Sequence, residues 1–225
     1  MRAGPKIVGM LDRRRDLPVQ HFHQHWRGPH AIEALKLAPK FIAQYVQNHS
    51  LHIPILGFAD ACDGCPVVWV HDAAAAAGMS QSEEYRTGAW LDEPRFMEYR
   101  SRGFIGHEQV VDAGPPMGRI PRSVKAMFFL KRQASLSRDD FLTEWTVMSH
   151  PLVHANPGAL RYVRTIPDDP GAWFDGLEEI WWDDIATFER SWRSREVAAI
   201  TSRLLDADAS RAMLVEEYRV VWPDP

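Results

Sequence analysis

His30 is the residue of this chain whose type and position best suit acid–base chemistry. It follows Phe22 and Trp26 at helical spacing, so the three side chains share one face if a helix continues through Gly28-Pro29. A neutral imidazole exchanges protons near neutral pH, which makes His30 a candidate general acid or base. The alternative is a buried histidine that hydrogen-bonds and closes the end of the helix.

His150 is a second candidate of the same kind. It follows Trp145 as His30 follows Trp26, with one extra residue between them. His150 or His154 could also serve as the axial ligand of a haem group, which needs a histidine aimed into a large apolar pocket. No phrase of this sequence matches a haem-binding family, and we expect no haem.

A third group of candidates lies on predicted strands. His71 is a candidate for proton transfer, and Asp183 occupies the corresponding place in the second half of the chain. The hydroxyl groups of Tyr45 and Tyr162 could polarise a substrate carbonyl or phenol. The alternatives are a solvated strand end for the first pair and aromatic side chains of a cavity wall for the second.

Two histidines stand at a spacing that metal sites use on helices. His21 and His25 are four residues apart. No acidic third ligand accompanies them in the pattern of the metalloproteases. A histidine-rich, solvated helix face is therefore the favoured interpretation.

Two cysteines, Cys62 and Cys65, have the spacing of a redox pair, and with His49 and His52 they could form a zinc site. The corresponding turn at residues 175–176 contains no cysteine, so the turn itself does not require a metal. We expect neither a metal nor another cofactor.

The elements that must position these residues occur twice in the chain. Phe22 and Trp26 recur as Phe141 and Trp145 at a constant offset of 119 residues. Further pairs recur at offsets of 119, 117 and 112, which indicates loops of different length: Lys6/Lys125, Leu11/Leu130, Arg13/Arg132, Tyr45/Tyr162, Val46/Val163, Asp63/Asp175, Gly64/Gly176 and Trp69/Trp181. Two copies fall short of a repeat array, and a duplicated domain is predicted.

Hydrophobic patterning predicts the order βαββαβ in each copy, which is the ferredoxin-like arrangement of an α+β protein. The predicted strands are residues 6–13, 41–49, 66–72, 104–112, 124–131, 159–166, 178–184 and 213–222. The predicted helices are residues 18–37, 73–77, 80–99, 138–154 and 186–205. The modules are predicted at residues 1–113 and 123–225, joined by a linker at 114–122 that is rich in proline and glycine.

A four-stranded antiparallel sheet with helices on one face leaves its other face bare. Packing two such bare faces together would give an intramolecular α+β barrel. Strand alternation assigns Val46, Val68, Val70 and Val163 to the helix-covered faces. It assigns a mixed aromatic and polar set to the barrel interior, whose composition suits a ligand cavity: Tyr45, Trp69, His71, Tyr162, Arg164, Trp181 and Asp183.

Composition excludes several classes of protein. Hydrophobic residues make up 45% of the 225 positions and 9 are tryptophan, which is ample material for a core. A net charge of -4 with interspersed signs argues against nucleic acid or an anionic membrane as the main partner. Without an apolar run of membrane-spanning length or a signal-peptide core, a cytoplasmic location is expected. The sequence is also compatible with a homodimer.

Three phrases carry a resemblance to a known family. They are Phe22-x-x-His25-Trp26-Arg27-x-x-His30-Ala31, then residues 44–48 (Gln-Tyr-Val-Gln-Asn), and then residues 174–183, which begin Phe-Asp-Gly-Leu-Glu-Glu. The chain resembles the EthD family of the dimeric α+β barrel superfamily over nearly its whole length, as two fused modules. The sequence departs from the pattern at Cys62 and Cys65, which flank the first Asp-Gly pair.

The resemblance implies a cofactor-independent lyase, dehydratase or cyclase acting on a small aromatic or polyketide-like carbonyl compound. His30, His71, Tyr45, His150 and Asp183 are then the catalytic candidates. The substrate-binding candidates are His25, Trp26, Trp69, Trp145, Tyr162, Arg164 and Trp181. The alternatives are a non-enzymatic ligand-binding or accessory protein, and a haem-dependent or cofactor-free oxygenase.

Overall fold

The computed structural model describes residues 4–98, 102–115, 123–155, 157–192 and 203–222, with the backbone alone at residues 150–155. The chain divides into two compact units. Unit 1 comprises Met1–Ser50, Cys62–His107 and Glu217–Pro225, and unit 2 comprises Leu51–Ala61 and Glu108–Glu216. Residues 116–122 of the predicted linker lie outside the described residues, so the predicted module bounds stay a prediction.

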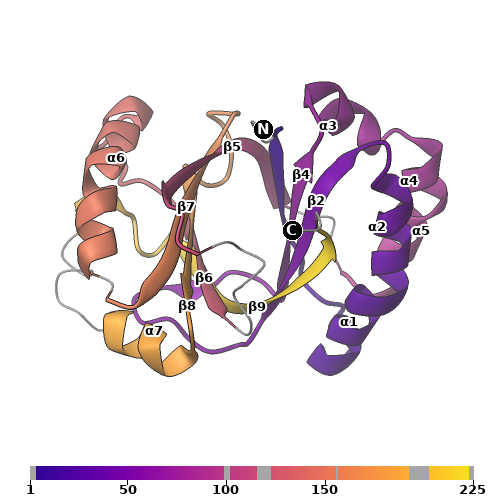
Figure 1. Cartoon of the computed structure of the whole chain (residues 1–225), viewed down its shortest axis with the longest axis horizontal. Helices are drawn as coiled ribbons and strands as arrows, with labels where there is room; N and C mark the ends of the chain where they lie inside the picture. The colour runs from indigo at the N-terminus through magenta and orange to yellow at the C-terminus, as the bar shows by residue number, and fades with distance from the viewer. Residues whose placement is uncertain (1–3, 99–101, 116–122, 156, 193–202, 223–225) are drawn as a thin grey trace. The chain divides into compact units, whose positions relative to one another are not determined.

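Unit 1 combines antiparallel strands with a layer of helices (Figure 1). Its strands pair in the order β2-β4-β1-β5. They are β1 (Lys6–Met10), β2 (Ile42–Ser50), β4 (Gly64–Val70) and the first half of β5 (Arg102–Asp112). The helices are α1 (Val19–His25), a π-helical turn η1 (Trp26–His30), α2 (Ala31–Leu37), α3 (Ala73–Met79), α4 (Glu83–Thr87), α5 (Ala89–Asp92) and the 3-10 turn η2 (Glu93–Arg95).

The first helical segment is continuous through Pro29. The sequence predicts a helix that is interrupted or bent near Gly28-Pro29, and the structure accommodates the proline by widening one turn into the π-helix η1. Proline lacks an N–H group, and its ring collides with the carbonyl group four residues earlier in a regular α-helix. The wider turn avoids this collision, and single π turns of this kind are frequent at functional sites. Both Trp26 and His30 belong to this turn.

The prediction of one continuous helix at residues 80–99 is wrong. The segment forms α4, α5 and η2, with a break at Gly88 where φ is −111° and ψ is −97°. A Cβ atom at Gly88 would lie 2.9 Å from the backbone carbonyl oxygen of Glu84, which favours glycine at this position. The break matters for function because it places α5 and η2 beside the first helical segment.

Unit 2 has the same kind of sheet, with β7-β8-β6-β9 paired antiparallel and the short β3 parallel to β9. Its strands are β3 (Ala59–Asp60), β6 (Val124–Leu130), β7 (Ala159–Pro167), β8 (Gly176–Trp182) and β9 (Arg211–Val221, as far as Glu216). Its helices are α6 (Arg138–Ala155) and α7 (Ile185–Trp192), and residues 193–202 of the predicted last helix lie outside the described residues.

A serine caps the N-terminus of α6. The Ser137 hydroxyl accepts a hydrogen bond from the Asp140 backbone N–H at 3.1 Å and donates one to the Asp140 carboxylate at 2.6 Å. A capping residue of this kind satisfies a backbone donor that the first helical turn leaves unpaired. Within the described residues no helix is long and apolar enough to cross a membrane.

The two Asp-Gly turns make matching contacts in their own units. In unit 1 the backbone N–H of Arg13 donates to Asp63 at 2.9 Å, and the Arg13 guanidinium pairs with the same carboxylate at 3.2 Å. In unit 2 the backbone N–H of Arg132 donates to Asp175 at 3.0 Å, and its guanidinium also pairs with that carboxylate. The carboxylate therefore fixes the end of the first strand to the turn in both places.

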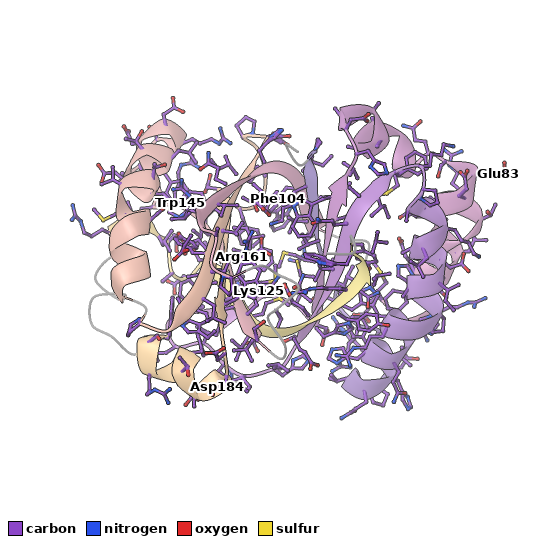
Figure 2. The ribbon with its side chains drawn as sticks, in the orientation of Figure 1. Glu83, Phe104, Lys125, Trp145, Arg161 and Asp184 are labelled. Atoms are coloured by element: carbon purple, nitrogen blue, oxygen red, sulfur yellow. The ribbon has the colours of Figure 1, made fainter. Side chains whose placement is uncertain are left out.

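The glycine of each turn leaves room for a tryptophan. A Cβ atom at Gly64 would lie 2.4 Å from the Trp26 ring, and one at Gly176 would lie 2.5 Å from the Trp145 ring. Figure 2 shows Trp145 on the side of α6 that faces the strands. This close approach explains why the Trp and Asp-Gly signals recur together in the sequence.

Gly64→Ala and Gly176→Ala are each expected to lower the free energy of unfolding by about 1–3 kcal/mol, because the added methyl overpacks a rigid indole. Urea denaturation of the two variants measures this. Gly78→Ala is the control, since its Cβ would meet only the Phe41 ring at 3.6 Å. Helix propensity predicts a gain of up to about 1 kcal/mol there. Equal effects at all three glycines would contradict the packing argument.

The sequence-based assignment of Tyr45 and Val46 to sheet faces is wrong. Tyr45 is paired directly with Val68 across β2 and β4, so the two side chains share one face. Both belong to the core beneath the helices, together with Leu37. Alternation then turns Val46 to the opposite face. The pattern within one strand could not reveal this, because the register between strands is needed.

Tyr162 and Arg164 in unit 2 also lie on the helix-covered face rather than on the predicted interior face. Tyr162 packs in a core that contains Phe141 and Trp145 of α6. The Arg164 guanidinium donates to the Ser149 hydroxyl of α6 at 2.8 Å. The same missing register explains this error.

Trp69 and Trp181 lie on the face turned away from the helices, as predicted. Their chain neighbours on β4 and β8 pack in the helix-side cores, and strand alternation directs the two indoles the other way. These neighbours are Val68, Val70, Ile180 and Trp182.

Candidate functional site

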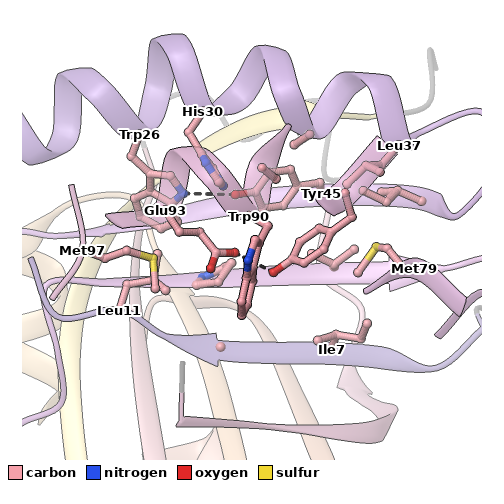
Figure 3. A pocket seen from close by; sticks show the side chains of 17 residues that line it. Ile7, Leu11, Trp26, His30, Leu37, Tyr45, Met79, Trp90, Glu93 and Met97 are labelled. Atoms are coloured by element: carbon pink, nitrogen blue, oxygen red, sulfur yellow. Dashed lines mark hydrogen bonds between the residues drawn. The ribbon is translucent and has the colours of Figure 1, made fainter. Parts of the chain in front are cut away.

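Unit 1 contains a cavity of about 260 Å³ between its helices and its sheet (Figure 3). The wall is mostly aliphatic, methionine and aromatic, with side chains from β1, β2 and β4 on one side and from the helices on the other. Trp26, Tyr45 and Trp90 are among its aromatic residues, and His30 and Glu93 are among its polar ones. A concave apolar site with a few convergent polar groups is typical of small-molecule binding.

His30 is held in one orientation by a carboxylate. Its Nδ1 lies 3.1 Å from Oδ2 of Asp92, and its ring packs against Phe96 at 4.9 Å. Because an ionised carboxylate only accepts hydrogen bonds, Nδ1 of the neutral imidazole carries the proton. Nε2 is then the acceptor nitrogen of a ring that lines the cavity. This is the arrangement of an oriented general base.

Asp92 also accepts a hydrogen bond from His25, whose Nε2 lies 2.9 Å from Oδ1. Burial by itself would raise the pKa of Asp92, but hydrogen bonds from His30 and His25 outweigh it and lower the pKa below its ordinary value. Asp92 is therefore a carboxylate near neutral pH. His25 is predicted from the sequence to bind substrate, and the structure places it on Asp92 and stacked on Phe96 at 5.2 Å rather than in the cavity wall.

Tyr45 and Trp26 form a hydrogen-bonded pair in the cavity wall. The indole N–H of Trp26 donates to the Tyr45 hydroxyl oxygen at 3.1 Å (Figure 3). Burial raises the pKa of Tyr45 far above its ordinary value, with a smaller contribution from the negative charge of Glu93. The phenol therefore keeps its proton and can act as a hydrogen-bond donor.

Trp90 and Glu93 of the cavity wall come from the segment after the Gly88 break, and Tyr85 comes from α4, before the break. Trp90 is on α5, and Glu93 begins η2. The Tyr85 hydroxyl donates to the Glu93 carboxylate at 2.6 Å, and the Tyr85 and Trp90 rings are 6.1 Å apart. Sequence reasoning missed Asp92, Trp90, Glu93 and Tyr85. The repeat comparison could not find them because residues 80–99 have no matched phrase in the second copy.

The other sequence-predicted site residues lie elsewhere. His71 is exposed just beyond β4, with Nε2 3.3 Å from the carbonyl oxygen of Ala38. Asp183 is exposed just beyond β8. His150 is on α6, and its side chain is outside the described ones. The structure thus brings His30, Tyr45 and Trp26 together at one cavity, and the roles predicted for the other residues stay predictions.

Unit 2 has a carboxyl group where unit 1 has Pro66. At the 112-residue offset Pro66 corresponds to Glu178, which accepts hydrogen bonds from the Trp145 indole N–H at 2.5 Å and from the Tyr162 hydroxyl. Burial raises the pKa of both Glu178 and Tyr162. In unit 2 the Trp145–Tyr162 pair therefore binds a buried carboxyl group. In unit 1 the corresponding Trp26–Tyr45 pair lines the cavity, together with Pro66.

A buried histidine lies beneath α1 in unit 1. His49 is 1% exposed, with Nε2 3.2 Å from Oε1 of Gln47, and its ring meets those of His23 and Trp26 at 4.7 and 4.5 Å. Burial lowers the pKa of His49 to about 2, and the charge of Arg27 adds to this shift. At the 117-residue offset unit 2 has Ile166 instead, so the fold itself does not need a histidine.

Stability is expected to fall on acidification because of His49. Above pH 6.5 its imidazole is neutral in the folded and the unfolded chain, so it adds no pH dependence. Below pH 6.5 His49 binds a proton in the unfolded chain, whereas in the folded chain it stays neutral down to about pH 2. At pH 5 the expected loss is about 2 kcal/mol. Urea midpoints at pH 7 and pH 5 measure it.

His49→Ile, which copies the residue of unit 2, should remove this part of the pH dependence whatever its own effect at pH 7. If wild type and His49→Ile lose the same stability between pH 7 and pH 5, the assignment to His49 is wrong.

The two cysteines have separate surroundings. Cys62 Sγ donates to the carbonyl oxygen of Gly64 at 3.1 Å, and burial raises its pKa to about 12. Cys65 is buried, and neither cysteine is in a disulfide bond. Within the described residues no group of three or more His, Cys, Asp or Glu side chains is arranged to hold a metal ion.

No protein-family model matches this chain, and no curated protein sequence matches it. Solved structures do share its fold. A candidate monooxygenase from Fusobacterium nucleatum aligns with a TM-score of 0.63 at 8% identity, covering 96% of this chain and 94% of its own. An anthrone oxidase-like protein aligns with a TM-score of 0.64 at 11% identity, covering 96% and 93%. A candidate monooxygenase from Lactobacillus acidophilus aligns with a TM-score of 0.55 at 7% identity, covering 96% and 94%.

These structures are of the dimeric α+β barrel type, and the present chain shares that fold over nearly its whole length. At such low identity the likeness concerns the fold alone. The predicted type of fold is therefore supported, while membership of the superfamily and the narrower resemblance to the EthD family stay predictions.

Proposed function

We propose that this protein is a cofactor-independent enzyme that acts on a small aromatic or enolisable carbonyl compound, and that the cavity of unit 1 is its active site. The observation that carries the proposal is His30, which lines the cavity while Asp92 holds its Nδ1. The sequence-based prediction placed the substrate in the interior of a barrel. The proposal moves the substrate to the space between the helices and the sheet of unit 1, because Tyr45 and Trp26 lie there.

In the proposed reaction Nε2 of His30 takes a proton from an acidic C–H or O–H group of the substrate. The bonding electrons stay on the substrate as an enolate or phenolate. Asp92 stabilises the resulting imidazolium, and the Tyr45 hydroxyl donates to the developing oxyanion. Trp26 and Trp90 provide aromatic surface for the ring. In a lyase reaction of the dehydratase type, His30 then gives the proton to a departing hydroxyl group, which leaves as water while the C=C bond forms. In a cyclase reaction the enolate carbon instead attacks a second carbonyl group of the substrate, and His30 gives the proton to the alkoxide oxygen that this bond formation produces.

A cofactor-free oxygenase is the second candidate, and the neighbours named as monooxygenases and as anthrone oxidase-like favour it. It would begin with the same deprotonation. The carbanion would then reduce O2, so that a ring CH2 group and O2 give a ring C=O group and water. This balance needs no external reductant.

We further propose that the two units are tandem EthD-like, ferredoxin-like modules, the intramolecular form of the dimeric α+β barrel type. The matching Arg13–Asp63 and Arg132–Asp175 pairs support this, as does the order of strands within each unit. Isolated production of residues 123–225 tests the module bounds, since a complete module should unfold cooperatively.

The experiment for the proposed function follows proton abstraction directly. Ketones and cyclic β-diketones whose acidic C–H group exchanges slowly in buffer are incubated with the enzyme in D2O, and loss of this C–H signal is followed by NMR. Exchange faster than the buffer rate, without O2 uptake at an oxygen electrode, supports the lyase type. Exchange with stoichiometric O2 uptake supports the oxygenase. Compounds that bind without exchange or turnover would instead indicate a ligand-binding protein.

A further inference from the structure

Glu93 gives the cavity of unit 1 an acidic group. Of the 17 residues that line the cavity, Glu93 is the only Asp, Glu, Lys or Arg among the described side chains. In Figure 3 its carboxylate lies between Trp26 and Trp90, on the inner side of the lining residues. Its charge is close enough to Tyr45 to raise the pKa of that phenol.

The carboxylate is oriented and still has capacity to accept. The Tyr85 hydroxyl donates to Oε1 at 2.6 Å, which fixes one oxygen. An ionised carboxylate has about four lone-pair sites on two oxygens, so a ligand donor can be added to the partners already present. Hydrogen bonds to a charged acceptor are roughly twice as strong as those between neutral groups.

The rest of the cavity wall contains no Asp, Glu, Lys or Arg among the described side chains. Its aliphatic and methionine residues, including Leu37, Val68, Met79 and Met97, favour a flat apolar body. Trp90 and Trp26 add aromatic faces. A ligand that enters without a donor would desolvate Glu93 without replacing its hydrogen bonds, which is unfavourable.

We propose that Glu93 selects small aromatic ligands that carry a hydroxyl donor, and that it disfavours their methyl ethers and anionic ligands. This inference rests on the proposed function, because it concerns the same cavity. It narrows the substrate class from aromatic or carbonyl compounds to hydroxylated aromatic compounds. It also separates two roles, with Glu93 holding a ligand hydroxyl and His30 exchanging a proton.

The test compares 2-naphthol with 2-methoxynaphthalene, which share a ring system and differ in the donor. Isothermal titration calorimetry on the full chain gives both dissociation constants. In wild type we expect 2-naphthol to bind about 10-fold to 100-fold more tightly. In Glu93→Leu this ratio should fall to about 1–3, and in Glu93→Gln, which keeps an oxygen acceptor without the charge, it should be intermediate.

Glu83→Leu is the matched control. Glu83 is an exposed glutamate on α4, points outward in Figure 2 and does not line the cavity, so this variant should keep the wild-type ratio. If circular dichroism shows that Glu93→Leu does not fold, Glu93→Gln alone is used to test the selectivity.

The outcomes separate the two proposals. Equal binding of both compounds to wild type overturns the selection by Glu93 and leaves the cavity as a ligand site. A ratio that survives in Glu93→Leu and Glu93→Gln also overturns it. Binding of neither compound to wild type, with no binding of the β-diketones, overturns both this inference and the proposed function.

Discussion

His30→Asn is expected to lower turnover of any compound that wild type converts by about 10²-fold to 10⁴-fold, the range typical of a lost general acid or base. The asparagine amide nitrogen can occupy the place of Nδ1, so that Asp92 keeps a donor and the fold is preserved. Asparagine offers no group that titrates near neutral pH. The dissociation constant of the substrate should change much less than kcat, and steady-state kinetics together with calorimetry measure both.

Two companion variants sharpen this prediction. Asp92→Asn should lower kcat as well, because an amide in that place no longer stabilises an imidazolium at His30. It should also shift the acidic limb of the pH–rate profile, which loss of structure alone would not do. His71→Asn separates the sequence-based account from the structure-based one, since His71 is exposed and does not line the cavity. Full activity in His30→Asn with loss in His71→Asn would contradict the site described here.

The second large effect concerns stability. Glu179→Leu is expected to lower the free energy of unfolding by about 3–5 kcal/mol, because it leaves a buried ammonium without its carboxylate partner. Lys125 Nζ lies 3.0 Å from Glu179 Oε1, and each side chain is 1% exposed. Lys125 Nζ also lies 4.8 Å from the centre of the Trp181 ring, which adds a cation–π contact within unit 2. Urea denaturation measures the effect.

The double variant Lys125→Met/Glu179→Leu provides the control. Replacing both charges by apolar groups of similar volume removes the desolvated charge together with its partner, which is often far less costly than removing one. The double variant should therefore be more stable than Glu179→Leu alone. If the double variant loses as much free energy of unfolding as Lys125→Met and Glu179→Leu lose in sum, the two side chains are not energetically coupled.

Much of the fold could be predicted because local signals agree with the tertiary contacts. Trp26 and Trp145 recur in the sequence because each packs on a glycine, and Asp63 and Asp175 recur because each fixes an arginine. Strand positions followed from β-branched and aromatic runs. The register between strands could not be predicted, because the sequence of one strand does not specify which residues it pairs with. The faces of Tyr45, Tyr162 and Arg164 were assigned wrongly for that reason.

The candidate site was predicted in part. His30, Trp26 and Tyr45 carry recognisable motif positions, and the structure places them at one cavity. Asp92 and Glu93 could not be found, because their role depends on the chain break at Gly88 and on contacts across more than 60 residues.

The central claim is that a small molecule binds in the cavity of unit 1, and a cavity-filling variant tests it most directly. Ala34 is a buried residue of α2 that lines the cavity, and Ala34→Phe would occupy much of its volume. Ala186→Phe makes the same substitution at an exposed position of α7.

The measurement is the rise in melting temperature caused by a hydroxylated aromatic ligand at about 100 times its dissociation constant. We predict a rise of about 5–10 °C in wild type and in Ala186→Phe, from about 2.7 kcal/mol of binding linkage. Ala34→Phe should fold and show almost no rise. An undiminished rise in Ala34→Phe would place the ligand elsewhere and contradict the account.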